Sequence, residues 1–344
     1  MRGLGRRLRF LAIATVIALA ASTVTGDATY RPSVRPVGWT STGELIFVHQ
    51  EETGGYDWRR YACGGSGVYV LRRRGPDPLI VGRPWCGRAD GVEGDFTLSA
   101  DGHRLFVAHE YPADHCGTLR TLDLRQGAWS RLFRTCTSDL SAAAVAPDGR
   151  AFVARRNCGW RYGGGEPPQV LPSGCVETRD GRLRLFSSDG TGERPIGGKT
   201  HEHPVWSPDG RALLVIDTDS QRIVRLDAAT GAERAITRGS DPAWSPDGRW
   251  IAFIGDDGSG GRSGSALRIV RTDGTGERTI FRFRERRTWN FDTRFNGAPE
   301  SPLWSPDGRG IVFVRHHNRG QTLWRVNADG TGLRRLTRPM QAAE

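Results

Sequence analysis

A segment containing Trp-Ser-Pro-Asp-Gly-Arg occurs three times in the second half of the chain, over residues 204–211, 242–249 and 302–309. Proline has the φ of the second position of a type I turn, aspartate tolerates the third position, and glycine takes the positive φ that closes a hairpin. An apolar run follows each copy and is typical of a buried strand. Each copy therefore predicts a strand, a tight turn and a second strand.

Weaker copies of this unit precede the three complete ones. Aligned on the tryptophan position, the six copies fall at residues 39, 98, 145, 206, 244 and 304. The shortest spacing is 38 residues, close to the roughly 40–45 residues of a four-stranded propeller blade. A second pattern, two strands around Asp-Gly-Thr-Gly, recurs at residues 183–196, 267–280 and 323–336. It matches the second half of a blade.

These repeats resemble the TolB-like β-propeller repeat family, a relative of the WD repeats, over about residues 36–340. The resemblance implies an all-β fold, a six-bladed β-propeller of four-stranded antiparallel blades. The Asp-Gly-Thr-Gly loops are interpreted as hairpin connections. A phosphate-binding loop would require a strand that leads into a helix, and the sequence shows no helical period.

Residues 1–26 have the pattern of an export signal. Arginines precede an apolar run over residues 10–21, and residues 18–20, Ala-Leu-Ala, suit cleavage. The run is short for a membrane span, so a cleaved signal is favoured, with an uncleaved N-terminal anchor as the alternative. Residues 27–344 then form a single propeller domain that is periplasmic, extracellular, or anchored to the membrane and facing outward.

The six cysteines agree with export to an oxidising compartment. In each of the first two blades, one cysteine begins a predicted strand and the next ends the following strand. These positions face each other in an antiparallel hairpin. The third pair would close an insertion in blade three. The predicted disulfides are Cys63–Cys86, Cys116–Cys136 and Cys158–Cys175. A metal site is the competing interpretation, but Cys-x-x-Cys spacing is absent from the sequence.

Polar residues precede the tryptophan in several copies, and the resemblance implies that this part of the strand lies near the central channel. They are Asp95, Glu202, His203, Asp241 and Glu300, with His201 and Ser301 beside them. Carboxylates and imidazoles that converge in a water-filled channel can hold a divalent cation or orient a small ligand. The alternative is a solvated channel lining. His201-Glu202-His203 does not have the spacing of the zinc-binding His-Glu-x-x-His helix.

Four insertions distinguish the blades, at residues 49–62, 155–180, 256–265 and 282–300. The first and last carry aromatic residues among arginines, a composition typical of binding surfaces. The same aromatic residues would serve equally to anchor their own loops on the blades.

The chain carries a formal net charge of +11. Its arginines are spread over every blade and Lys199 is the only lysine. The sequence therefore does not favour nucleic acid as the partner, whereas diffuse attraction to an anionic surface polymer stays open.

Catalytic motifs such as Gly-x-Ser-x-Gly are absent from the sequence. The resemblance implies a scaffold in the cell envelope that binds another envelope protein or a small ligand, without a resident cofactor. The alternative is a propeller enzyme, a lactonase-like hydrolase with a metal or an acid–base pair in the channel. Membrane contact is expected only if the N-terminal segment is not cleaved.

Overall fold

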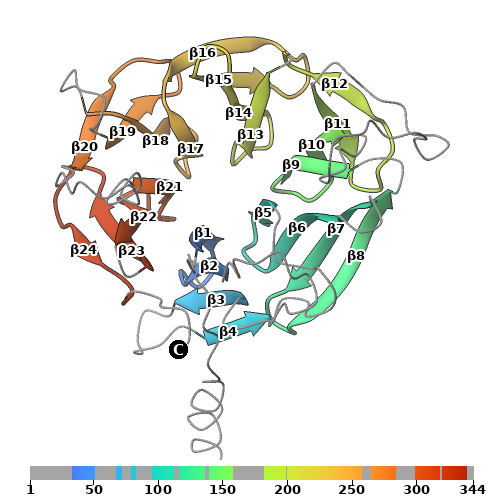
Figure 1. The fold of residues 1–344 in the computed structure, drawn as a ribbon, viewed down its shortest axis with the longest axis horizontal. Coiled ribbons are helices and arrows are strands. Elements are labelled where there is room, and N and C mark those ends of the chain that lie inside the picture. Colours follow the sequence, from blue (N-terminus) through green and yellow to red (C-terminus); the bar gives the residue numbers. More distant parts are fainter. Residues whose placement is uncertain are drawn as a thin grey trace, which may run out of the picture.

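The computed structural model describes residues 33–50, 67–71, 79–82, 95–111, 116–135, 139–157, 182–198, 200–257, 265–283, 299–317 and 320–338. They form six sheets, each of four antiparallel strands. The sheets are arranged as the blades of a ring, and the first strand of each blade is innermost (Figure 1). The fold is the six-bladed β-propeller that the repeats predict.

Each blade consists of four strands that are consecutive in the sequence. Blades 1 and 2 are β1 (Ser33–Trp39), β2 (Leu45–Gln50), β3 (Gly67–Leu71), β4 (Leu79–Gly82), and β5 (Asp95–Leu98), β6 (Arg104–Tyr111), β7 (Cys116–Asp123), β8 (Ala128–Thr135). Blades 3 and 4 are β9 (Asp139–Val145), β10 (Ala151–Asn157), β11 (Leu183–Ser187), β12 (Arg194–Ile196), and β13 (His201–Trp206), β14 (Ala212–Asp217), β15 (Arg222–Asp227), β16 (Glu233–Arg238). Blades 5 and 6 are β17 (Ser240–Trp244), β18 (Trp250–Asp256), β19 (Ser265–Arg271), β20 (Arg278–Phe283), and β21 (Pro299–Trp304), β22 (Gly310–His317), β23 (Gly320–Asn327), β24 (Arg334–Arg335).

The repeated turn joins the first two strands of a blade. In blade 4, the Gly210 N–H donates to the Ser207 carbonyl over 2.9 Å, and Gly210 has a φ of 69°. The Ser207 hydroxyl donates to Asp209 over 2.6 Å and accepts from the Ala212 N–H over 2.9 Å. These bonds tie the two strands together at the turn, as the sequence predicts. The tips of these turns define what we call the turn end of the ring.

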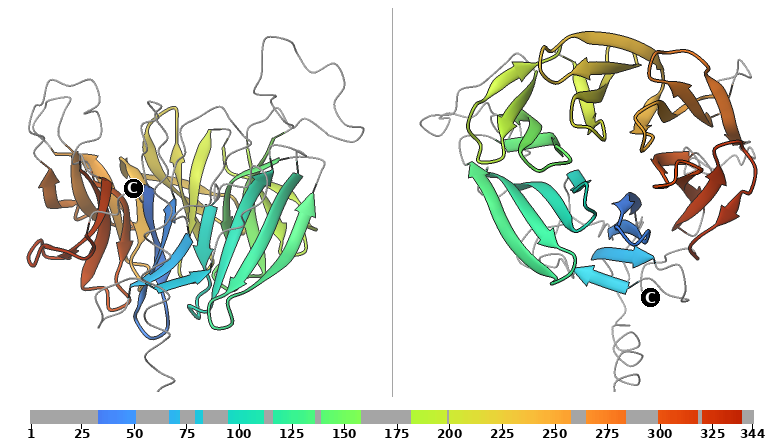
Figure 2. Two further views of the ribbon diagram at one scale, coloured as in Figure 1. Left: turned by 60° about the horizontal axis from the view of Figure 1, so that its bottom comes forward. Right: turned by 180° about the vertical axis from the view of Figure 1, so that it is seen from behind.

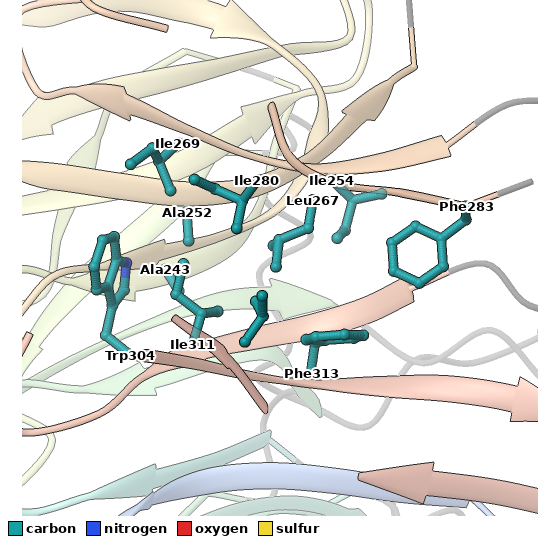
Figure 3. Packing of buried hydrophobic residues seen from close by; sticks show 11 residues of the cluster. Ala243, Ala252, Ile254, Leu267, Ile269, Ile280, Phe283, Trp304, Ile311 and Phe313 are labelled. Carbon is teal, nitrogen blue, oxygen red and sulfur yellow. The ribbon is translucent and has the colours of Figure 1, made fainter. Parts of the chain in front are cut away.

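The hydrophobic core lies between neighbouring blades. Figure 3 shows the cluster between blades 5 and 6, in which Leu267 and Phe283 of blade 5 pack toward Ile311 and Phe313 of blade 6. The rings of Phe283 and Phe313 meet edge to face with centroids 5.7 Å apart, a favourable geometry for aromatic pairs. Because each blade covers the face of the next, the ring is stabilised by blade-to-blade burial.

The ring closes where blade 6 meets blade 1. A buried cluster joins Val34, Leu45 and Phe47 of blade 1 to residues of blade 6, Val312, Val314 and Leu323. Among the described strands, none is shared between these two blades. Side-chain packing closes this seam together with hydrogen bonds that Val34 and Trp39 of blade 1 donate to blade 6. The two further views in Figure 2 also place the first and last blades side by side.

Several sequence predictions fall wholly or partly outside the described residues. The export signal at residues 1–26 is one of them, and it stays a prediction. No helix within the described ranges is long and apolar enough to cross a bilayer. The predicted insertions are shorter than proposed at their described edges, because residues 49–50, 155–157, 256, 265, 282–283 and 299–300 belong to strands.

Candidate functional site

The innermost strands carry the polar residues that the sequence singled out. Glu202 and His203 lie on β13, Asp241 on β17, and Glu300 on β21. Each stands three or four positions before the tryptophan of its copy, in the half of the strand away from the turn end. Asp95 begins β5, and its side chain is outside the described part. The ring thus distributes these residues over several blades, on the strands nearest its centre (Figure 1).

The inner strands of blades 4, 5 and 6 share one backbone distortion. Their pairing with the second strand shifts register between Glu202 and Val205, and at the equivalent places in β17 and β21. Within each shift, one residue that is not glycine has a positive φ: His203 at 51°, Asp241 at 50° and Ser301 at 49°. Such a bulge changes the direction of the side chain, and the left-handed conformation costs on the order of 1–3 kcal/mol. Blades 4, 5 and 6 therefore each hold a strained residue at the equivalent position near the centre of the ring.

A proline follows each strained residue, at positions 204, 242 and 302. Proline has no N–H to donate to the ladder, so in a sheet it is confined to edge strands and bulges. The inner strand of each blade is an edge strand. This proline is the sequence signal that would have located the bulges.

Glu202 is already engaged by a neighbouring blade. Arg155 of β10 donates from Nη1 to Glu202 Oε1 over 3.0 Å and from Nη2 to the His201 carbonyl over 2.8 Å. The two side chains are 21% and 39% exposed, so solvent weakens the ion pair. A cation at Glu202 would have to compete with the Arg155 guanidinium.

His201 is a buried structural residue. Its side chain is 3% exposed, and its Nδ1 accepts the Gly198 N–H over 3.1 Å. Since Nδ1 acts as the acceptor, Nε2 carries the proton in the neutral ring, and Nε2 lies 3.7 Å from Glu233 Oε2. These contacts hold His201 away from the polar group at the centre.

The other candidates differ in exposure and partners. His203 is exposed, whereas Asp241, Glu300 and Ser301 are half-buried. Asp241 accepts a hydrogen bond of 2.8 Å from the hydroxyl of Ser240. In the described part of the chain, no three His, Cys, Asp or Glu side chains converge as a metal site would require. The candidate residues therefore occupy similar positions along their inner strands, but within the described part of the chain they do not form a cluster.

The predicted disulfides stay predictions. Cys116 is the first residue of β7, but its side chain is outside the description, and the other cysteines lie in residues that the structure does not describe.

No protein-family model matches the chain. A segment of 86 residues is 31% identical to the Tol-Pal system protein TolB of Thioalkalivibrio sulfidiphilus, covering 25% of this chain and 17% of that protein. The repeats of this chain are TolB-like β-propeller repeats. TolB of Acinetobacter baumannii has a similar structure, with a TM-score of 0.52, 14% identity, and coverage of 94% of this chain and 68% of that one.

The TolB-like fold is shared with an enzyme. Oligogalacturonate lyase, solved in complex with manganese, superposes with a TM-score of 0.51 and 15% identity over 86% of this chain and 90% of that one. At such identities the structural likeness shows the fold alone.

Sequence reasoning missed two pockets between TolB-like blades at the turn end. One, of about 630 Å³, lies between blades 6 and 1, and we call it the seam pocket. The other, of about 380 Å³, lies between blades 4 and 5, and we call it the 4/5 pocket. Both are lined by arginines from the outer two strands of the preceding blade, Arg325, Arg334 and Arg335 for the seam pocket and Arg225 and Arg234 for the 4/5 pocket. Alignment of the outer strands would have shown these recurring arginines, but not that they line a cavity.

Proposed function

We propose that this protein is an exported scaffold of the cell envelope whose TolB-like propeller binds a partner protein or a small ligand at the inner strands. The observation that carries the proposal is the bulge repeated at His203, Asp241 and Ser301. Strained residues of this kind cluster at ligand-binding and active sites, where the surrounding fold maintains them. The polar side chains beside the bulges offer hydrogen-bonding groups to a partner.

The same proposal includes export and oxidation. Residues 1–26 would direct the chain out of the cytoplasm, and residues 27–344 would form the mature propeller. The disulfides Cys63–Cys86, Cys116–Cys136 and Cys158–Cys175 would form there. Mass spectrometry of the mature protein checks both points: an intact residue 1 would contradict cleavage, and Cys63 joined to another partner would contradict the pairing.

Affinity capture from a cell-envelope extract tests the scaffold. The full chain and the double variant His203→Ala/Asp241→Ala serve as baits at low and at moderate salt. We expect one protein to be retained at both salt concentrations by the native chain and lost from the double variant. Arg211→Ala, an exposed residue beside the repeated turn, is the control that keeps retention. Equal retention by the double variant would contradict a partner site at the inner strands, and loss on raising the salt alone would indicate an anionic polymer instead.

A second candidate is an enzyme that uses a divalent cation or an acid–base pair at the same inner strands, such as a lactonase-like hydrolase. Two observations favour keeping it: Glu202, His203, Asp241 and Glu300 lie on inner strands, and a structurally similar lyase was solved with manganese. Elemental analysis of the purified protein and melting with and without a chelator test it. Absence of metal together with an unchanged melting temperature would exclude the metal-dependent form.

A further inference from the structure

The seam pocket has more arginines than its acids balance. Arg325 on β23 stands directly opposite Arg334 on β24, and like charges in this cross-strand position repel. Arg335 follows Arg334, and both side chains are exposed. Asp307 is the single carboxylate among the described lining residues. Arg325 and Arg334 therefore lie on the face of blade 6 that meets the seam, with one acid among the described lining residues. Arg335 pairs with Trp324, which packs toward blade 5, so its side chain starts from the other face of the blade.

That acid is occupied within its own turn. Asp307 Oδ1 accepts from the Ser305 hydroxyl over 2.6 Å and from the Arg309 N–H over 3.0 Å. Within the described residues, the guanidinium groups of Arg334 and Arg335 take part in no hydrogen bond or ion pair. The Nε of Arg325 is buried without an acceptor. Arg325 lies close enough to Asp307 to help lower the pKa of that carboxyl, so among the described residues the guanidinium group of Arg334 is left without an acceptor in the seam pocket.

The 4/5 pocket provides the comparison inside the same chain. Arg225 and Arg234 stand opposite each other as Arg325 and Arg334 do. This pocket, however, is lined by three aspartates, Asp209, Asp247 and Asp273. Arg234 is satisfied there, since its Nη2 donates to the Asp273 carbonyl over 2.7 Å.

One replacement distinguishes the seam pocket. Where blade 5 has Asp247 in its turn, blade 1 has Thr42 at the equivalent position. Among the described lining residues, the seam pocket has one acid where the 4/5 pocket has three, and it is also the larger of the two. Its excess of positive charge comes from this smaller number of acids, because the opposed pair Arg325 and Arg334 is matched by Arg225 and Arg234 in blade 4.

The other residues that line the seam pocket limit the chemical class of ligand that it can bind. Thr40, Ser41 and Thr42 supply hydroxyl groups on one side, and Leu71 and Leu336 supply an apolar wall. Arginine forks match carboxylates in a bidentate manner. An inorganic anion would leave the apolar wall uncovered, whereas a peptide brings carboxylates and apolar side chains together. We propose that the seam pocket binds an acidic peptide segment in which carboxylates alternate with apolar side chains.

This site goes beyond the function proposed above, because it lies at the turn end, away from the candidate residues of the inner strands. The test measures fluorescence anisotropy of a labelled peptide of alternating Glu and Leu, titrated with the purified full chain near physiological salt. The competitors are the unlabelled acidic peptide, a peptide with Gln in place of Glu, inorganic phosphate and oligogalacturonate. We expect only the acidic peptide to displace the label effectively.

Matched variants locate the binding. Arg325→Gln/Arg334→Gln should weaken binding about tenfold or more, because charge-assisted hydrogen bonds are lost. Arg225→Gln/Arg234→Gln, the same change in the 4/5 pocket, should leave binding nearly unchanged. Equal weakening by both variants would overturn the proposal in favour of diffuse charge. Stronger competition by phosphate or oligogalacturonate would overturn the peptide as the ligand.

Thr42→Asp keeps the proposal testable if the arginine variant does not fold. It gives blade 1 the aspartate that blades 4, 5 and 6 have in this turn, so the change suits the turn. We expect it to weaken peptide binding strongly while every arginine stays in place. Unchanged binding by a folded Thr42→Asp protein would overturn the proposal.

Discussion

The indole Nε1 of Trp39 in blade 1 donates a hydrogen bond of 2.8 Å to the main-chain carbonyl of Trp304 in blade 6. Two other repeat tryptophans bond to the preceding blade in a similar way: Trp206 donates to the Ala144 carbonyl and Trp244 to the Val205 carbonyl, each over 3.0 Å. Trp304 itself is different, because its Nε1 is buried without an acceptor. The repeat tryptophan thus fills the space between blades and, in these three copies, also links them by a hydrogen bond.

Trp206→Phe should destabilise the protein more than Trp304→Phe. Both tryptophans are buried, with 9% and 5% of their surface exposed, so the two substitutions remove a similar packed volume. Only Trp206→Phe leaves a buried carbonyl without its donor, which costs about 1–3 kcal/mol. Urea unfolding followed by circular dichroism measures the difference. Equal losses in the two variants would mean that the hydrogen bond contributes nothing beyond packing.

The repeated turns should make stability depend on acid pH. The hydroxyls of Ser207, Ser245 and Ser305 donate to Asp209, Asp247 and Asp307, and these bonds are the largest cause that lowers the pKa of each carboxyl. A group whose pKa is lower in the folded state contributes stability above its unfolded pKa, about 3.9 for aspartate. That contribution is lost as the pH falls through the folded pKa.

We therefore expect the unfolding midpoint in urea to be nearly constant from neutral pH down to about pH 4 and to fall below it. Ser245→Ala removes the hydrogen bond that contributes most to the lowered pKa of Asp247. We expect this variant to be less stable at neutral pH, and its unfolding midpoint to fall less steeply in acid. Ser188→Ala is the control, because the Ser188 hydroxyl is not among the causes that lower the pKa of the neighbouring Asp189. A profile of Ser245→Ala parallel to that of the native protein would contradict the assignment.

Arg155 and Glu202 should be coupled weakly and in a salt-dependent way. The ion pair joins blades 3 and 4 over 3.0 Å but is partly exposed, and such pairs contribute roughly 0.2–1 kcal/mol. A double-mutant cycle with Arg155→Gln and Glu202→Gln measures the coupling free energy. We expect it to shrink at high salt; a coupling that is unchanged by salt would indicate a buried network instead.

The sequence was sufficient for the blades because their determinants are local. The turn from Ser207 to Gly210 and the apolar run after it lie within a few residues of each other, and the pattern recurs. The contacts between blades are different: Trp39 meets Trp304, and Arg155 meets Glu202, across long stretches of chain. No local pattern specifies which loop faces which arginine, so the seam pocket emerges only from the closed ring.

The positions of the candidate residues on the inner strands were predictable in part, whereas their role as a site stays a prediction. These residues were identified from their place before the tryptophan, and the structure puts Glu202, Asp241 and Glu300 on inner strands. The burial of His201 and the pairing of Glu202 with Arg155 depend on neighbouring blades, and so were not predictable from the segment. The positive φ at His203 could have been predicted from the proline that follows it.

His203→Gly should stabilise the protein and weaken the partner binding proposed for the inner strands. Glycine adopts a φ near 51° without the steric cost of a side chain, so relief of strain is expected to stabilise the fold by about 1 kcal/mol. Removal of the imidazole costs little packing, because the His203 side chain is exposed. Val205→Gly on the same strand is the control and should destabilise, because Val205 pairs regularly with Leu214 and glycine weakens a strand interior. Urea unfolding measures both variants, and the envelope capture assay follows partner binding. A more stable His203→Gly protein that still retains the partner would show that the strain serves no binding role. Gain of stability with a loss of capture that His203→Ala does not share would tie the left-handed bulge to the binding proposed for the inner strands, because His203→Ala removes the imidazole without relieving the strain.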